Sequence, residues 1–189
     1  RIVDISFPCG RDAVEAVLPH RDPFLWVSCV VSCEPGVEVT AELDVDPDLP
    51  LFKGHFPGHP VLPGVVIMEA LAQAASFCVL VERGTEGAIG FLTGIDNAKF
   101  RRQVEPGETL TLQGRIVKSS SRLVVAEVEA SVDGAVCATA TQKYVLAKAE
   151  AERGDDRSMK QRMQDYITIG SDGTVLPKGG AAVAVAEQA

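Results

Sequence analysis

The feature that most constrains the fold is an apolar stretch, residues 65–81, which contains neither proline nor glycine. Such a stretch predicts one helix, and Arg83-Gly84 predicts its C-terminal end. Apolar residues lie on every side of this helix, and a helix without a polar face is buried in a protein or in a membrane. The stretch is shorter than the ~20 residues that a bilayer span needs. We therefore expect it to form the centre of a protein core, with no membrane insertion.

Glu69 is the one acidic residue of this apolar stretch. Burial opposes ionisation of a carboxyl group, so an enclosed Glu69 is expected to be neutral or to have a partner. Gln73 lies four residues later on the same helix face, where its amide can hydrogen-bond to Glu69 and orient it. A satisfied buried acid and a catalytic acid both fit this pattern.

The eleven residues before the helix, 54–64, include three prolines and three glycines, which predicts an irregular loop. His55 lies on this loop, and the prolines limit its movement. An imidazole and a protonated carboxylic acid provide a base and an acid that both work near neutral pH. His59, between Gly58 and Pro60, is a second histidine of the loop and is expected to brace it.

Three blocks of sequence, residues 18–25, 54–73 and 94–108, carry a family resemblance. They read LPHRDPFL, then GHFPGHPVLPG followed by EALAQ, then GIDNAKFRR followed by VEPGE. In this order and spacing they resemble the motifs of the 3-hydroxyacyl-[acyl carrier protein] dehydratases of fatty-acid synthesis (FabZ type). The resemblance covers about residues 10–147. It implies that His55 and Glu69 face each other from two protomers of a homodimer, commonly assembled into a hexamer.

Dehydration of a 3-hydroxyacyl thioester needs a base for the C2 proton, an acid for the departing hydroxyl and donors for the thioester oxygen. His55 suits the base and Glu69 the acid. The free backbone N–H groups at the start of the helix, those of Gly64 and Val65, suit the oxygen. Gly64 also lets substrate approach closely. The reaction requires no metal and no organic cofactor, and the product is a trans-2-enoyl thioester.

The pattern around the helix predicts one antiparallel sheet. We expect a short helix at residues 11–17 and a turn at Pro106-Gly107, and a tight hairpin turn at Asp133-Gly134. Strands are predicted at residues 24–31, 37–45, 88–95, 110–118, 123–132 and 135–146. Such a sheet buries the long helix only by wrapping around it, which is the α+β hot-dog fold that the resemblance also implies. Residues 1–147 are the predicted dehydratase domain, and residues 148–189 a charged and then flexible extension.

The net charge of −8 argues against binding to nucleic acid and to anionic membranes. An acidic carrier protein therefore requires a local basic patch, for which Lys53, Lys99, Arg101 and Arg102 are the candidates. Scattered solvated charges explain the same residues equally well.

The five cysteines are odd in number and include no C-x-x-C pair or zinc-site spacing, which predicts reduced structural thiols. The first residues contain no apolar signal core, so a cytoplasmic location is expected.

Several alternatives remain open on the sequence. A hot-dog acyl-thioesterase would use its carboxylate to activate water, and a non-catalytic acyl-binding module would lack the His/Glu pair. A related dehydratase-isomerase group carries aspartate at the position of Glu69, which favours dehydration without isomerisation here. His20 and Arg21 are expected to be structural. Gly90-Phe91 stands where relatives often carry a tyrosine that gates the acyl tunnel, which leaves chain-length preference open.

Overall fold

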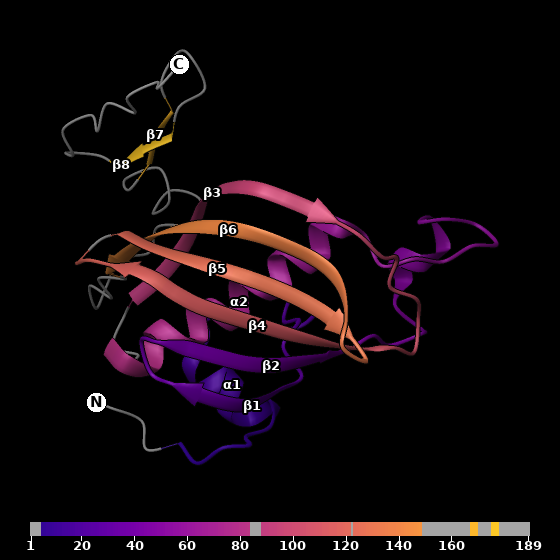
Figure 1. Ribbon diagram of the computed structural model, residues 1–189, viewed down its shortest axis with the longest axis horizontal. Helices are drawn as coiled ribbons and strands as arrows, with labels where there is room; N and C mark the ends of the chain where they lie inside the picture. The colour runs from indigo at the N-terminus through magenta and orange to yellow at the C-terminus, as the bar shows by residue number, and fades with distance from the viewer. Residues whose placement is uncertain (1–4, 84–87, 122, 149–166, 170–174, 178–189) are drawn as a thin grey trace, which may run out of the picture. The chain divides into compact units, whose positions relative to one another are not determined.

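The computed structural model describes residues 5–83, 88–121, 123–148, 167–169 and 175–177 (Figure 1). The chain divides into two compact units, Arg1–Ala149 and Glu150–Ala189. In the second unit, β7 (Ile167–Ile169) and β8 (Val175–Pro177) pair in antiparallel fashion, so part of the predicted flexible tail is a short ladder. The charged part of the predicted extension, residues 149–166, lies outside the described residues, whereas Lys148 ends a strand of the first unit.

The first unit is one curved antiparallel sheet around one long helix, α2 (Gly64–Arg83). The strand order is β1-β2-β4-β5-β6-β3. The strands are β1 (Cys29–Glu34), β2 (Glu38–Asp44), β3 (Ala88–Phe100), β4 (Thr109–Ser119), β5 (Leu123–Val132) and β6 (Ala135–Lys148). A short helix, α1 (Arg11–Val17), and a 3-10 turn, η1 (Pro50–Lys53), complete the unit. Figure 1 shows the sheet passing over α2, which confirms the predicted hot-dog arrangement.

Alternation along the strands builds the contact between sheet and helix. In β4, Leu110 and Leu112 are fully buried, whereas the alternate side chains, those of Thr111 and Gln113, face away from the core. Gly114 continues the inward row at the point where the helix comes closest. A Cβ on Gly114 would lie 3.4 Å from the Cβ of Ala75 of α2, so small residues on both sides permit the close approach.

Helix α2 is 20 residues long, which is longer than predicted and long enough for a membrane span by length alone. The helix is nevertheless a core helix of this fold, because 72% of its most apolar window is buried inside the protein itself. The expectation that every side is buried was wrong for the first turns. Val65 is 76% exposed and the Glu69 side chain 24% exposed.

The strand predicted at residues 24–31 begins later, at Cys29. The side chain of Gln73 explains this later start, because it forms hydrogen bonds with the main chain before Cys29. The backbone N–H of Trp26 donates to Gln73 Oε1 (2.8 Å), and the Phe24 carbonyl accepts from Gln73 Nε2 (2.8 Å). The main chain at these two residues therefore bonds to a helix side chain in place of a neighbouring strand.

Strand β3 forms one edge of the sheet and extends to Phe100, beyond its predicted end at residue 95. Its register with β6 shifts twice, and Asn97 adopts a positive φ of 54° at the second shift. Large apolar side chains remain exposed along this edge, namely Leu92, Ile95 and Phe100.

Candidate active site

The loop before α2 fixes the ring of His55. Its Nδ1 lies 2.9 Å from the carbonyl oxygen of Val61, and the Val61 N–H donates to the His55 carbonyl (3.0 Å). A carbonyl oxygen only accepts, so Nδ1 carries the hydrogen of this bond. In the neutral imidazole the other nitrogen, Nε2, is then unprotonated and is the atom able to take a proton. The ring is also stacked on Phe56, with centroids 4.1 Å apart.

A tight turn holds the same loop together. The N–H of Phe56 donates to the carbonyl of His59 (3.1 Å), and the N–H of His59 donates back to Phe56 (3.0 Å). Pro57 and Gly58 form the turn between them, and Gly58 has a φ of 76°, a conformation that glycine adopts without strain. The predicted bracing by His59 thus comes from its backbone, while its side chain is exposed.

Glu69 lies one turn into the helix with two neighbours on one of its oxygens. Gln73 Nε2 donates to Glu69 Oε1 at 3.0 Å, and His20 Nε2 lies 3.6 Å from the same oxygen. Gln73 is buried, and its amide also bonds to the backbone of residues 24 and 26 described above. Because both ends of this amide are engaged, its orientation towards Glu69 is fixed. The other carboxylate oxygen has no hydrogen-bond partner among the described residues.

His20 was expected to be structural, yet its ring lies beside the carboxyl group of Glu69. Burial lowers the pKa of His20, the negative charge of Glu69 opposes this shift and Arg21 adds to it. Its Nδ1 is buried without a hydrogen-bond partner in the described part of the chain. Arg21 fixes the loop, as predicted, by donating to the carbonyl of Leu18 (2.8 Å). Nothing in the sequence separation of His20 and Glu69 predicts that the two side chains are in contact.

The N-terminus of α2 presents the N–H groups predicted for the substrate oxygen. Val66 and Ile67 donate to the Pro63 carbonyl, whereas the N–H groups of Gly64 and Val65 have no acceptor among the described residues. The space beside Gly64 is not open, however. A Cβ on Gly64 would lie 2.7 Å from Cε1 of Phe100, so the absence of a side chain accommodates that ring. Sequence reasoning missed Phe100, which is distant along the chain.

The predicted base and acid are not paired with each other in the described part of the chain. No hydrogen bond or ion pair joins His55 to Glu69 in the described residues. Three large apolar side chains near them are instead open to solvent: Phe56 is 52% exposed, Val65 76% and Phe100 55%. Exposed apolar side chains of this size are candidates for a surface of association.

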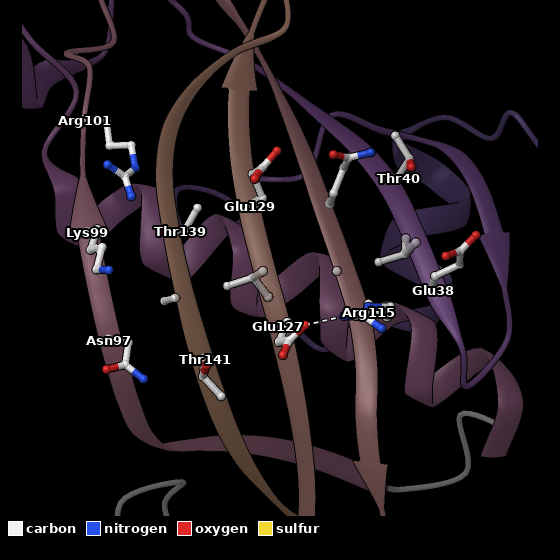
Figure 2. A pocket seen from close by; sticks show the side chains of 15 residues that line it. Glu38, Thr40, Asn97, Lys99, Arg101, Arg115, Glu127, Glu129, Thr139 and Thr141 are labelled. Atoms are coloured by element: carbon white, nitrogen blue, oxygen red, sulfur yellow. Dashed lines mark hydrogen bonds and ion pairs between the residues drawn. The ribbon is translucent and has the colours of Figure 1, made fainter.

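The predicted basic patch is divided in the structure. Lys99 and Arg101 line a hollow of about 550 Å³ on the face of the sheet away from α2, as Figure 2 shows. Arg102 instead pairs with Glu108 (2.5 Å), and this bond lowers the pKa of the Glu108 carboxyl group. Among the described residues, neither Lys99 nor Arg101 has a carboxylate within ion-pair distance. The same hollow is also lined by Glu38, Arg115, Glu127 and Glu129.

All five cysteines are free thiols. Within the described ranges, no group of three or more histidine, cysteine, aspartate or glutamate side chains is placed to hold a metal ion.

Comparisons with known proteins place this chain in a family. The model of the FabA-like domain matches residues 18–141. A 3-hydroxyacyl-[acyl-carrier-protein] dehydratase FabZ of Ruminiclostridium cellulolyticum is 46% identical over 136 residues, which cover 72% of this chain and 96% of that relative. The corresponding FabZ of Oceanobacillus iheyensis is 44% identical, covering 71% and 96%. Among solved structures, the dehydratase heterocomplex ApeI:P from Xenorhabdus doucetiae matches with a TM-score of 0.64 at 21% identity, covering 76% of this chain and 93% of that one. The last likeness concerns the fold alone.

Proposed function

This chain belongs to the FabZ-type 3-hydroxyacyl-[acyl carrier protein] dehydratases of the FabA-like family, and on that premise we propose how its residues perform the reaction. The chain is a hydro-lyase of fatty-acid biosynthesis that removes water from a 3-hydroxyacyl-[acyl carrier protein]. The products are the trans-2-enoyl thioester and water.

His55 is the base that removes the proton from C2. The observation that carries this assignment is the contact between Nδ1 and the Val61 carbonyl, because it leaves Nε2 as the free acceptor of the neutral ring. The stacked Phe56 ring and the proline-rich loop hold the imidazole in one orientation, which lowers the entropy cost of reaching the transition state.

Glu69 is the acid that gives its proton to the departing hydroxyl group. Gln73 donates to one carboxyl oxygen, so the proton of the acid form is carried by the other oxygen, which is free to face the substrate. The N–H groups of Gly64 and Val65 stabilise the negative charge that develops on the thioester oxygen, since they lie at the positive end of the helix and have no acceptor among the described residues.

The complete site forms between two copies of the chain. No hydrogen bond or ion pair joins His55 to Glu69 in the described part of one chain, and the apolar side chains of Phe56, Val65 and Phe100 are exposed. In the proposed arrangement, a two-fold dimer covers these side chains and brings His55 of one protomer to Glu69 of its partner. We extend the proposal to a hexamer of three such dimers and to a cytoplasmic location.

The acyl carrier protein approaches over Lys99 and Arg101, which line the outer hollow and form no ion pair with any described residue. The net charge of the chain is −8, so attraction of an acidic partner depends on local positive charge. Arg102 has a different role in this proposal. Its pairing with Glu108 holds the turn after β3.

The test is a product analysis. Purified protein is incubated with a 3-hydroxyacyl thioester of acyl carrier protein, and intact-mass spectrometry follows the loss of one water. The expected product is the trans-2-enoyl thioester, with no 3-enoyl isomer. Release of free carrier-protein thiol without an enoyl product would establish thioesterase activity and contradict the proposal. An unchanged but tightly bound substrate would establish a non-catalytic binding module.

A further inference from the structure

Two buried amides of the first unit converge on one turn of α2. Gln73 is 1% exposed and Gln142, on β6, is 0% exposed. The first bonds to the carboxyl group of Glu69, and the second bonds to the backbone one residue earlier: Gln142 Nε2 donates to the carbonyl oxygen of Met68 at 2.8 Å. A buried amide lowers stability unless its polar atoms are hydrogen-bonded. Two buried amides at one turn of the helix therefore indicate a specific role for that turn.

The contact from β6 has a second link. The hydroxyl group of Tyr144, which is 3% exposed, donates to Gln142 Oε1. Because Oε1 accepts from the phenol and Nε2 donates to Met68, the amide of Gln142 cannot turn over without losing both bonds. The carbonyl of Met68 has two lone pairs, so it accepts this bond in addition to its helical bond. The result is a fixed connection from the sheet to the peptide group that precedes Glu69.

The neighbours of this pair show that the position is unusual. Along β6 the residues that face the helix before Gln142 are Ala138 and Ala140, and on β5 they include Ala126 and Val128. An apolar side chain would satisfy a core position of this kind at no polar cost. The amide occurs where the helix carries the acid of the proposed reaction, and the peptide plane it holds sets the direction of the Glu69 side chain.

We propose that Gln142 and Tyr144 are positioning residues, which hold the turn of α2 so that the Glu69 carboxyl group meets the 3-hydroxyl of the bound thioester. This inference rests on the proposed role of Glu69. Neither residue touches the substrate.

The negative charge of Glu69 affects the pKa of Tyr144. Burial raises the pKa of the Tyr144 phenol, and the negative charge of Glu69 raises it further. The phenol therefore remains a protonated donor throughout the working range of the enzyme, whichever protonation state Glu69 has during the cycle.

The experiment combines single variants with a double-mutant cycle. Gln142→Met keeps the volume and removes both bonds, and Tyr144→Phe removes only the hydroxyl group. We expect kcat to fall about 10- to 100-fold in Gln142→Met and about three- to tenfold in Tyr144→Phe, with KM little changed. In the Glu69→Gln background both losses should disappear, because a residue that acts through Glu69 has nothing left to position. Ser131→Ala, which alters another buried polar residue on the neighbouring strand, is the matched control and should retain full kcat.

Several outcomes overturn the inference. Gln142→Met and Tyr144→Phe variants with wild-type kcat and a lowered Tm would show a purely structural role. Losses that multiply in the Glu69→Gln background would show an effect independent of the acid. If Gln142→Met does not fold, the cycle with Tyr144→Phe decides. An inactive wild-type chain overturns the proposed function and the inference together, whereas an active wild type with unaffected variants overturns the inference alone.

Discussion

The two ends of α2 differ in how completely one chain covers them. From Ala70 to Val81 the helix is almost completely enclosed, and Leu71, Ala74 and Phe77 are 0% exposed. The helix contacts mainly β2, β4 and β5. The first turn is open, with Val65 76% exposed. The same helix therefore serves as a core element at one end and as a surface element at the other.

The difference shows what each end requires. The enclosed end is stabilised by apolar burial within the chain, at roughly 25 cal/mol per Å² of apolar surface. At the open end, no hydrogen bond or ion pair joins the predicted base and acid among the described residues, and apolar side chains near them are exposed to water. We propose that function at this end depends on the surface of a second protomer, while the fold depends on the other end. Variants of the two ends should therefore separate loss of activity from loss of stability.

Glu69→Gln is the change with the largest expected effect. It preserves the shape and the bond to Gln73 but cannot donate a carboxylic proton, so turnover should fall about 10²- to 10⁴-fold with an unchanged Tm. Steady-state kinetics on a carrier-protein thioester measure it. Glu82→Gln, near the other end of the same helix, is the control and should retain near wild-type turnover. A well-folded Glu69→Gln protein with normal turnover would refute the role of Glu69.

The shared site is tested by mixing two inactive chains, His55→Ala and Glu69→Ala. If His55 of one protomer works with Glu69 of the other, a mixed dimer has one site with both lesions and one site with neither. About half of the wild-type activity per dimer should then return. The assay uses differently tagged chains, co-expressed and purified through both tags. Activity no higher than that of the parents would mean that each site forms within one chain.

Charge reversal separates the two parts of the predicted basic patch. Arg101→Glu should raise KM for carrier-bound substrate about three- to tenfold, with a smaller effect in high salt, and leave a small soluble thioester unaffected. Arg102→Glu should instead lower Tm, because it opposes Glu108 with a like charge. Equal effects of Arg101→Glu on both substrates would place Arg101 in the pocket or the fold, and not in carrier recognition.

Local patterns in the sequence predicted most of the fold. The period-two alternation of β4 and β5 placed both strands within one residue of their observed ends, and the turn at Asp133-Gly134 forms with positive φ at both residues. These features depend on neighbours along the chain. The long apolar stretch likewise specified α2, because propensity and the absence of proline act locally.

The features that sequence reasoning missed are contacts between distant segments. Gln73 bonds to Trp26 and thereby delays the start of β1, and His20 lies beside Glu69. Phe100 fills the space beside Gly64. Each pair is separated by tens of residues, and no periodicity or composition links its members. The residues of the candidate site were therefore visible in the motifs, while their mutual geometry required the fold.

The smallest expected effect is on the pH dependence of protein stability, through the protonation of His20, whose ring lies beside Glu69. Burial lowers the pKa of this histidine from its ordinary value of 6.5, with Glu69 opposing the shift and Arg21 adding to it. Above that value both the folded and the unfolded chain hold a neutral imidazole. Below it the unfolded chain takes up a proton that the folded chain resists, so acidification favours unfolding until the folded pKa is passed.

His20→Asn removes this linkage. Between a pH of about 7.5 and about 5.5, the Tm of the wild type should fall more than that of the variant, by on the order of 2 °C. Differential scanning fluorimetry at matched ionic strength measures both. His59→Asn is the matched control, because His59 is exposed on the loop and its removal should leave the wild-type dependence unchanged. A His20→Asn protein that loses as much Tm on acidification as the wild type would show that burial of His20 does not oppose its protonation. The surroundings of His20 would then be as accessible to water as the first turn of α2.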